Sequence, residues 1–212
     1  MQHSAKQLAI ITLLIISVFT IVQCTSSDNG KKPEQVSTPD VSIEKGHHLV
    51  IAAGCNDCHS PKIMTPQGPK LDSTRLYSGH PAGDKLPPIN LTALEPGSWL
   101  NFSADLTSCV GPWGLTFAAN ITSDSLTGIG AWSESTFVNT IRTGKHLGHE
   151  HGRPIMPPMP WENYKNLSDD DLKSIYAYLQ TTIPVNNRVH EPYSPAQVKE
   201  MAKSQQEQIA KK

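Results

Sequence analysis

The chain has 212 residues and a formal net charge of −1 at pH 7, because 18 Lys and Arg stand against 19 Asp and Glu. This length is enough for one ordinary domain with some excess. The balanced charge gives no basic surplus of the kind that nucleic-acid binding requires, so we expect no nucleic-acid partner.

The N-terminus has the pattern of an export signal. Lys6 precedes an apolar run over residues 8–22, which is shorter than the roughly twenty residues that a membrane-spanning helix needs. Residues 21–24, Ile-Val-Gln-Cys, resemble the lipobox of bacterial lipoproteins, although Gln23 stands where a small residue is usual. We predict a signal peptide over residues 1–23 and a lipid on Cys24, with an uncleaved anchor or release into the periplasm as alternatives. All three place the chain on the periplasmic side of a bacterial membrane.

A polar tether and a helix follow the signal. Residues 24–40 contain almost nothing apolar, so they predict a flexible, lipid-anchored tether. The apolar and small residues between Ile43 and Gly54 recur at helical spacing, with Asp40 or Ser42 available as an N-cap. This pattern predicts a helix that ends at a cysteine motif.

The middle of the chain is rich in helix-breaking residues. Residues 60–131 are dense in Pro and Gly, which disfavours long regular helices. Ser133 then caps a predicted helix over about residues 134–142, and Gly144 is placed to end it. A Pro-rich loop over residues 153–161 comes next. We therefore predict a mainly α class with much loop.

The clearest predicted helix begins after Ser168. Asp171, three residues further on, completes a capping-box-like start, and the apolar residues from Leu172 to Leu179 form one stripe. Pro184 marks the end of this helix. From about residue 191 the chain is polar, and we expect residues 191–212 to be a frayed tail.

The sequence Cys55-Asn-Asp-Cys58-His59 is a Cys-x-x-Cys-His motif. In this motif the two thiols add to the two vinyl groups of haem and the adjacent imidazole reaches the iron. A zinc site would need two more ligands, and the chain has no second Cys-x-x-Cys to supply them. A thioredoxin-type dithiol expects βαβ surroundings, which are not visible here. We therefore predict one covalently attached haem c, with Cys109 buried and no structural disulfide.

Several segments together resemble class I cytochrome c over about residues 41–185. The resemblance rests on Gly46, the Cys55–His59 motif, a late Met-Pro and Ala177-Tyr178-Leu179. Further segments are similar to a bacterial monohaem branch of that family: Gly111–Asp124, Thr127–Gly130 and Met159–Trp161. The resemblance implies a cytochrome c fold within residues 41–190, in which the first and last helices cross where Gly46 lets Tyr178 pack closely.

The resemblance also implies that the iron lies between a His and a Met. A thioether is a soft ligand suited to iron, and Met opposite His raises the reduction potential. We take His59 and Met159 as the axial ligands, with Met156 as the alternative. Because His59 and Met159 are far apart in sequence, residues 62–131 form a long, loop-rich insertion between the haem-attachment motif and the distal Met loop.

Other polar and apolar residues are secondary candidates. Arg153 and Trp161 flank the Met loop and are possible hydrogen-bond donors to the haem propionates. His146, His149 and His151 could bind a transition metal if their loop folded back, but a solvated loop is the preferred interpretation. The large apolar residues of the insertion and just beyond it are expected to cover a haem face: Leu76, Tyr77, Trp99, Leu100, Phe102, Trp113, Phe117 and Trp132.

These observations predict a single-electron carrier. Iron held by both His and Met has no open position for a substrate, so the chain is not expected to be an enzyme in itself. The expected partners are a dehydrogenase as donor and a terminal oxidase or bc-type complex as acceptor, in a periplasmic or membrane-associated respiratory chain. The alternatives are a haem subunit of a dehydrogenase or oxidase complex and a haem sensor with a labile sixth ligand. The single Cys-x-x-Cys-His motif disfavours a two-haem peroxidase.

Overall fold

The computed structural model describes residues 40–211. The predicted signal peptide, the lipid-bearing Cys24 and the tether up to residue 39 lie outside the described residues. Within them, no helix is both long enough and apolar enough to cross a membrane. The described part contains six α-helices, two short 3-10 helices and two small antiparallel sheets.

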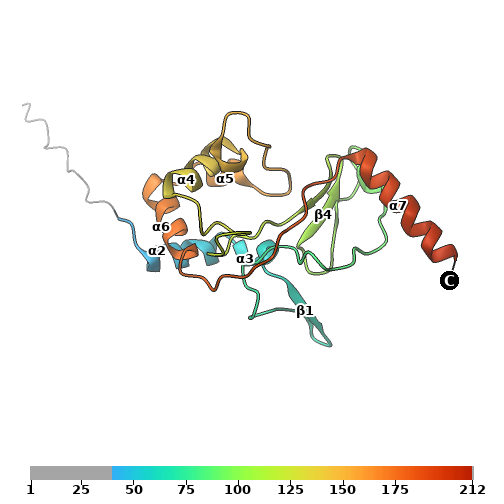
Figure 1. Cartoon of the computed structure of the whole chain (residues 1–212), viewed down its shortest axis with the longest axis horizontal. Helices are drawn as coiled ribbons and strands as arrows, with labels where there is room; N and C mark the ends of the chain where they lie inside the picture. The colour runs from blue at the N-terminus through green and yellow to red at the C-terminus, as the bar shows by residue number, and fades with distance from the viewer. Residues whose placement is uncertain (1–39, 212) are drawn as a thin grey trace, which may run out of the picture. The chain divides into compact units, whose positions relative to one another are not determined.

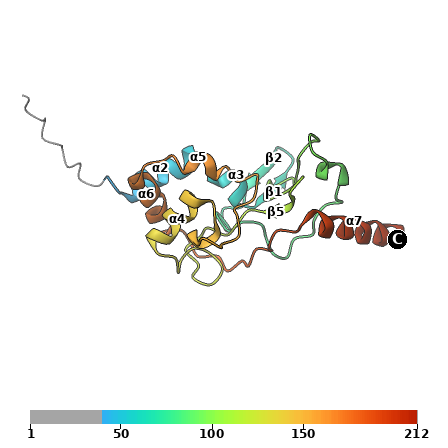
Figure 2. The ribbon, with the colours of Figure 1, turned by 90° about the horizontal axis from the view of Figure 1, so that it is seen from above.

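The helices α2 (Ile43–Ala52) and α6 (Asp169–Leu179) lie side by side (Figures 1 and 2). They approach closely because Gly46 has no side chain. A Cβ built at Gly46 would lie 1.9 Å from the carbonyl oxygen of Ser174 and 2.9 Å from the Cβ of Tyr178. The close approach of Tyr178 that the resemblance implied is therefore present in the structure.

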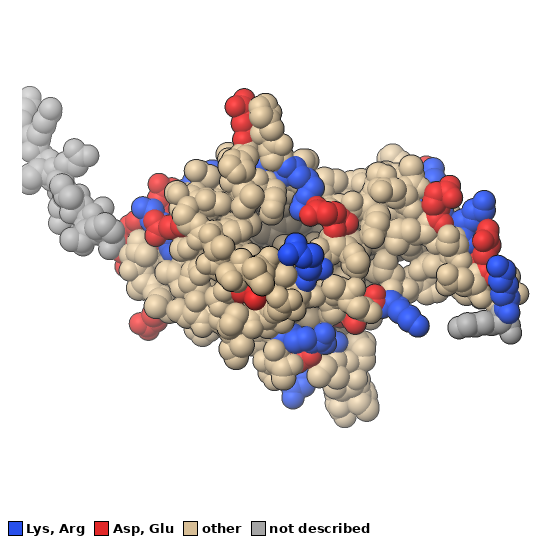
Figure 3. All heavy atoms as spheres, viewed as in Figure 1, with Lys and Arg blue, Asp and Glu red and all other residues tan. Residues whose placement is uncertain are grey.

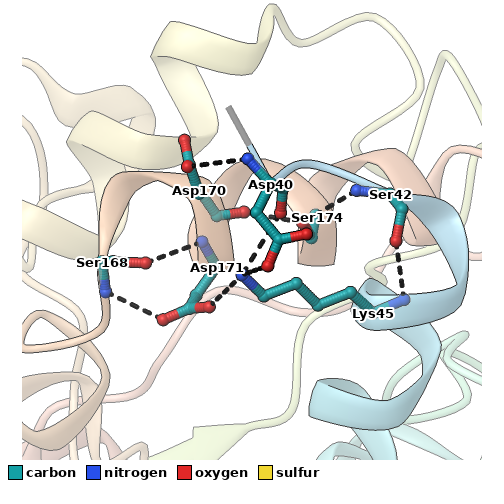
Figure 4. Close-up of polar contacts among 7 residues, drawn as sticks. All are labelled: Asp40, Ser42, Lys45, Ser168, Asp170, Asp171 and Ser174. Carbon is teal, nitrogen blue, oxygen red and sulfur yellow. Dashed lines mark hydrogen bonds and ion pairs between the residues drawn. The ribbon is translucent and has the colours of Figure 1, made fainter. Parts of the chain in front are cut away.

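Polar contacts hold the N-terminal ends of these two helices together (Figure 4). The ammonium group of Lys45 on α2 pairs with Asp40, at 3.0 Å, and with Asp171 on α6, at 2.9 Å. Asp171 also accepts a hydrogen bond from the backbone N–H of Ser168 and so completes the capping box of α6. Lys45 therefore connects the start of α2 to the N-cap region of α6.

A first core lies where α2 and α6 meet α4 (Glu134–Thr143). The helix α4 begins at Ser133, whose hydroxyl accepts a hydrogen bond from the N–H of Thr136, and ends at Gly144 with φ of 65°. Both ends agree with the prediction. The buried residues of the first core are Val50, Tyr77, Ile129, Phe137, Ile141, Leu172, Ile175 and Leu179.

The predicted insertion contains strands that the sequence did not reveal. A hairpin joins β1 (Lys62–Thr65) to β2 (Gly68–Leu71), and a three-stranded antiparallel sheet contains β3 (Asn101–Phe102), β4 (Ser108–Gly111) and β5 (Gly114–Phe117) in that order. The expected mainly α class is therefore only partly correct, because the described chain is mixed. Strands of two to four residues are too short to show an alternating apolar pattern.

The C-terminal region is a helix rather than a frayed tail. Helix α7 (Pro195–Ala210) begins at a capping box formed by Ser194 and Gln197, and it buries Val198 and Ala202. It packs against β5 and the 3-10 helix η1 (Leu91–Leu94). This second core consists of Ala93, Leu94, Val110, Leu115 and Val198. The expectation of fraying is wrong because a small core needs only a narrow apolar face, which leaves most of the helix polar.

Three of the apolar residues that we expect to cover a haem face are exposed in the structure. Trp99 is 85% exposed, and Leu100 and Phe102 are each 41% exposed. By contrast, Tyr77 is 3% exposed and lies in the first core. The insertion thus contributes to two separate cores.

Candidate haem site

The three residues of the attachment motif lie on one short helix, α3 (Cys55–His59), which is labelled near the centre of Figure 1. Gly54 separates it from α2 with φ of 67°, a left-handed conformation that suits glycine. Positions three residues apart on a helix lie on one face, so Cys55 and Cys58 face the same way. This is the arrangement that attachment to two vinyl groups of one haem requires.

The imidazole of His59 is held by a backbone carbonyl. Its Nδ1–H donates a 2.7 Å hydrogen bond to the carbonyl oxygen of Ala119. This bond fixes the tautomer and leaves Nε2 as the free ligand atom. Burial lowers the pKa of His59, and the bond to Ala119 opposes that shift. The neutral imidazole, the form that binds a metal, is therefore favoured at neutral pH.

The two cysteines of the motif are free thiols. Burial raises the pKa of Cys55 to about 11, and burial also raises the pKa of Cys58. Both are therefore protonated at pH 7. Cys109 is 2% exposed, which confirms its predicted burial, and burial raises its pKa to about 11.

Hydrogen bonds connect Tyr77 to Asn56, which lies on α3, and to Ser60, which directly follows α3. The Tyr77 hydroxyl accepts a 3.0 Å bond from the amide nitrogen of Asn56 and lies 3.4 Å from the hydroxyl of Tyr178. Its backbone N–H donates to Ser60 Oγ, which in turn donates to Asn56 Oδ1. Asn56 occupies one of the variable positions of the motif, so its role was not visible in the sequence.

A second tyrosine holds the backbone just before α3 begins. The hydroxyl of Tyr164, on helix α5 (Trp161–Tyr164), donates a 2.8 Å hydrogen bond to the carbonyl of Ala53, two residues before Cys55. Because α5 directly follows the Met loop, this bond connects the loop region to the attachment helix. Sequence reasoning did not identify Tyr164.

The loop before α5 carries both candidate sulfur ligands. Met156 and Met159 are each half-buried. The loop is held at its start by the N–H of Ile155, which donates a 2.7 Å bond to the carbonyl of Gly144, and further along by the hydroxyl of Thr116, which donates a 2.8 Å bond to the carbonyl of Pro157. Met159 and Met156 both stay candidates for the sixth ligand.

The secondary candidates lie around the same loop. Arg153 pairs with Glu191 at 2.9 Å, and Trp161 packs against Gly144 with the Lys165 ammonium 5.4 Å above its ring. The roles of Arg153 and Trp161 at haem propionates stay predictions.

The three histidines beside this loop are all exposed, and the 3-10 helix η2 (His146–Gly148) begins at the first of them. The His146 ring packs against Trp132 at 5.7 Å. Between residues 40 and 211, no group of three or more His, Cys, Asp or Glu side chains is placed to hold a metal ion.

The side chains present fit a covalently attached haem. Two thiols face one side of α3, and the adjacent imidazole is oriented by Ala119 with one nitrogen free. Figure 3 shows that one face of the molecule is hollowed near its middle, with acidic and basic side chains close to the rim. A thioether of the Met loop is the soft ligand that would complete a donor set suited to haem iron.

Comparison with known proteins gives several similarities to cytochrome subunits. The chain is 28% identical over 152 residues to the fructose dehydrogenase cytochrome subunit of Gluconobacter japonicus, and 27% identical over 162 residues to the gluconate 2-dehydrogenase cytochrome c subunit of Pantoea cypripedii. These matches cover 72% and 76% of this chain. It is also 38% identical over 74 residues, 35% of this chain, to a subunit of the nicotinate dehydrogenase of Pseudomonas putida. No family model matches the chain.

The matched regions are small parts of these relatives. They make up 24% of the fructose dehydrogenase subunit, 27% of the gluconate dehydrogenase subunit and 6% of the nicotinate dehydrogenase subunit. The similarities support a c-type cytochrome, as the Cys55–His59 motif predicts.

Proposed function

We propose that this chain is an electron-transfer cytochrome that carries one haem c on Cys55 and Cys58, with His59 and Met159 as axial ligands. The observation that carries the proposal is the hydrogen bond from His59 to the Ala119 carbonyl, on the same helix that presents both thiols. Bound haem supplies a reversible one-electron change at the iron. The protein attaches the haem, fixes the orientation of the imidazole and limits access of water.

The chain acts as a carrier rather than as a catalyst in itself. When His59 and Met159 both hold the iron, no position is open for a substrate. Met opposite His also raises the reduction potential into the range of electron carriers. The names of the relatives agree with this role, because they are cytochrome subunits of dehydrogenases.

The proposed electron donor is a dehydrogenase, and the chain serves either as a free carrier or as a subunit of such a complex. The acceptor is a terminal oxidase or a bc-type complex. We further propose that a lipid on Cys24 holds the chain on the periplasmic side of a bacterial membrane. Replacing Cys24 by Ser is then expected to move the protein from the membrane fraction to the soluble periplasmic fraction.

The attachment can be tested with cysteine variants matured in a host that attaches c-type haem. Wild type is expected to keep its haem after denaturation and to take up one electron per chain in a redox titration. Cys55→Ala and Cys58→Ala are each expected to lose a thioether bond, and the double variant to lose covalent haem altogether. Cys109→Ala is the matched control, because Cys109 is also a free thiol but lies outside the motif. Wild type without covalent haem contradicts the proposal.

A further inference from the structure

We propose that Thr116 is a positioning residue, whose hydroxyl holds the Met loop so that Met159 stays on the iron. The proposal rests on the proposed function, because it takes Met159 as the distal ligand. It assigns the insertion a role at the haem, since Thr116 belongs to strand β5 of the insertion.

The hydroxyl of Thr116 lies between the insertion sheet and the Met loop. Thr116 is 5% exposed and pairs with Cys109 across the β4–β5 ladder. Its Oγ1 is 2.8 Å from the carbonyl oxygen of Pro157 and 3.3 Å from that of Cys109. A hydroxyl has a single hydrogen, so Thr116 donates it mainly to the carbonyl of Pro157, which is the nearer of the two acceptors. The indole N–H of Trp113 donates to the same oxygen at 3.4 Å and helps to orient it.

The same stretch of chain also holds the proximal ligand. Ala119, three residues after Thr116, supplies the carbonyl that accepts the hydrogen bond from His59. Ala118, between them, is fixed by a 2.8 Å bond from its N–H to the carbonyl of Thr107. Three residues of extended chain span at most about 11 Å. Residues 116–119 therefore contact His59 at one end and the Met loop at the other. The short length of this segment limits how far apart His59 and the Met loop can lie.

The Met loop has few other anchors close to Met159. The N–H of Met159 reaches the carbonyl of Met156 only at 3.4 Å, which is a long bond within the loop itself. The bond between Ile155 and Gly144 lies four residues earlier in the chain. Pro157 and its neighbour Pro158 have no N–H to donate. Thr116 is thus the contact that ties the centre of the loop to the body of the protein.

The test compares Thr116→Val, which keeps the shape but removes the hydroxyl, with Thr116→Ser, which keeps the hydroxyl. Thr116→Ala removes the hydroxyl without adding bulk and is measured in parallel, in case the valine variant does not accumulate with haem. Ser174→Ala is the matched control, because it removes another buried hydroxyl, one that donates a 2.6 Å bond within α6 away from the loop. All are prepared as haem-loaded protein.

The measurements are the weak far-red absorption band of Met bound to ferric iron, the affinity of the ferrous form for carbon monoxide, and the reduction potential. We expect Thr116→Val and Thr116→Ala to weaken the band, lower the potential and raise the carbon monoxide affinity about fivefold, the equilibrium change that one buried hydrogen bond corresponds to. Thr116→Ser is expected to match wild type. Ser174→Ala is expected to lower only the unfolding midpoint.

Two results would overturn the inference in distinguishable ways. If wild type shows the band but the valine and alanine variants match it in all three measurements, the inference fails and the proposed ligands stand. If wild type lacks the band, or Met159→Ala leaves it unchanged, the assignment of Met159 fails and the inference fails with it.

Discussion

Replacing Gly46 by Ala tests whether the close contact between α2 and α6 is needed for stability. The added Cβ would lie 1.9 Å from the Ser174 carbonyl oxygen, whereas ordinary contact begins at 3.4 Å, so the two helices would have to separate locally by about 1.5 Å. Overpacking costs about 1–3 kcal/mol, and a clash against a backbone carbonyl belongs at the upper end of that range. The substitution also gains about 1 kcal/mol of helix propensity. The expected net loss is about 2 kcal/mol.

The assay is thermal and denaturant unfolding of the haem-loaded protein. A loss of this size corresponds to a fall of about 4–8 °C in the unfolding midpoint of a domain this large. Gly83→Ala is the matched control, because Gly83 lies in an open turn where an added Cβ meets no atom within 4 Å. Ala at Gly83 is expected to leave stability unchanged or to raise it slightly. If Gly46→Ala is as stable as Gly83→Ala, the close α2–α6 contact is refuted.

Three further predictions concern other polar contacts among the described residues. Hydrogen bonds from Thr74 and Arg75 lower the pKa of Asp72 to about 2. The contribution of Asp72 to stability is therefore present above about pH 4 and is lost as the pH falls towards 2. Asp72→Asn is expected to flatten that part of the pH–stability curve, and an unchanged curve contradicts this. Tyr164→Phe removes the bond to the Ala53 carbonyl and is expected to cost about 0.5–1.5 kcal/mol in denaturant unfolding, while a cost near zero means that the bond does not form. Lys45→Met is expected to cause a small loss of stability that shrinks as salt is added, and a loss independent of salt argues against the ion pairs.

Local signals in the sequence predicted the helices of the first core. Ser133 and Ser168 are N-caps in the structure as predicted, and Gly144 ends α4 in a left-handed conformation. Ser42, rather than Asp40, caps α2. These features depend on residues within a few positions of one another, so they can be read directly from the chain.

Other features depend on contacts between distant segments. The partner of His59 is the backbone carbonyl of Ala119, and a carbonyl is present at every residue, so nothing in the sequence marks it. The hydroxyl of Thr116 meets Pro157 only because the insertion folds against the Met loop. Helix α7 was missed because its apolar residues are few and become buried only against a core made by the insertion.

The central claim is that haem iron in this protein is held by His59 and Met159. It is tested most directly by the optical spectrum of the haem-loaded protein, oxidised and reduced, with and without carbon monoxide, beside Met159→Ala and Met156→Ala. We predict a low-spin wild type with the far-red Met-to-iron band and only very weak binding of carbon monoxide, and we predict that, of these two variants, only Met159→Ala loses both properties. Wild-type protein that binds carbon monoxide readily has an open sixth position, and that result would contradict the account of an electron carrier.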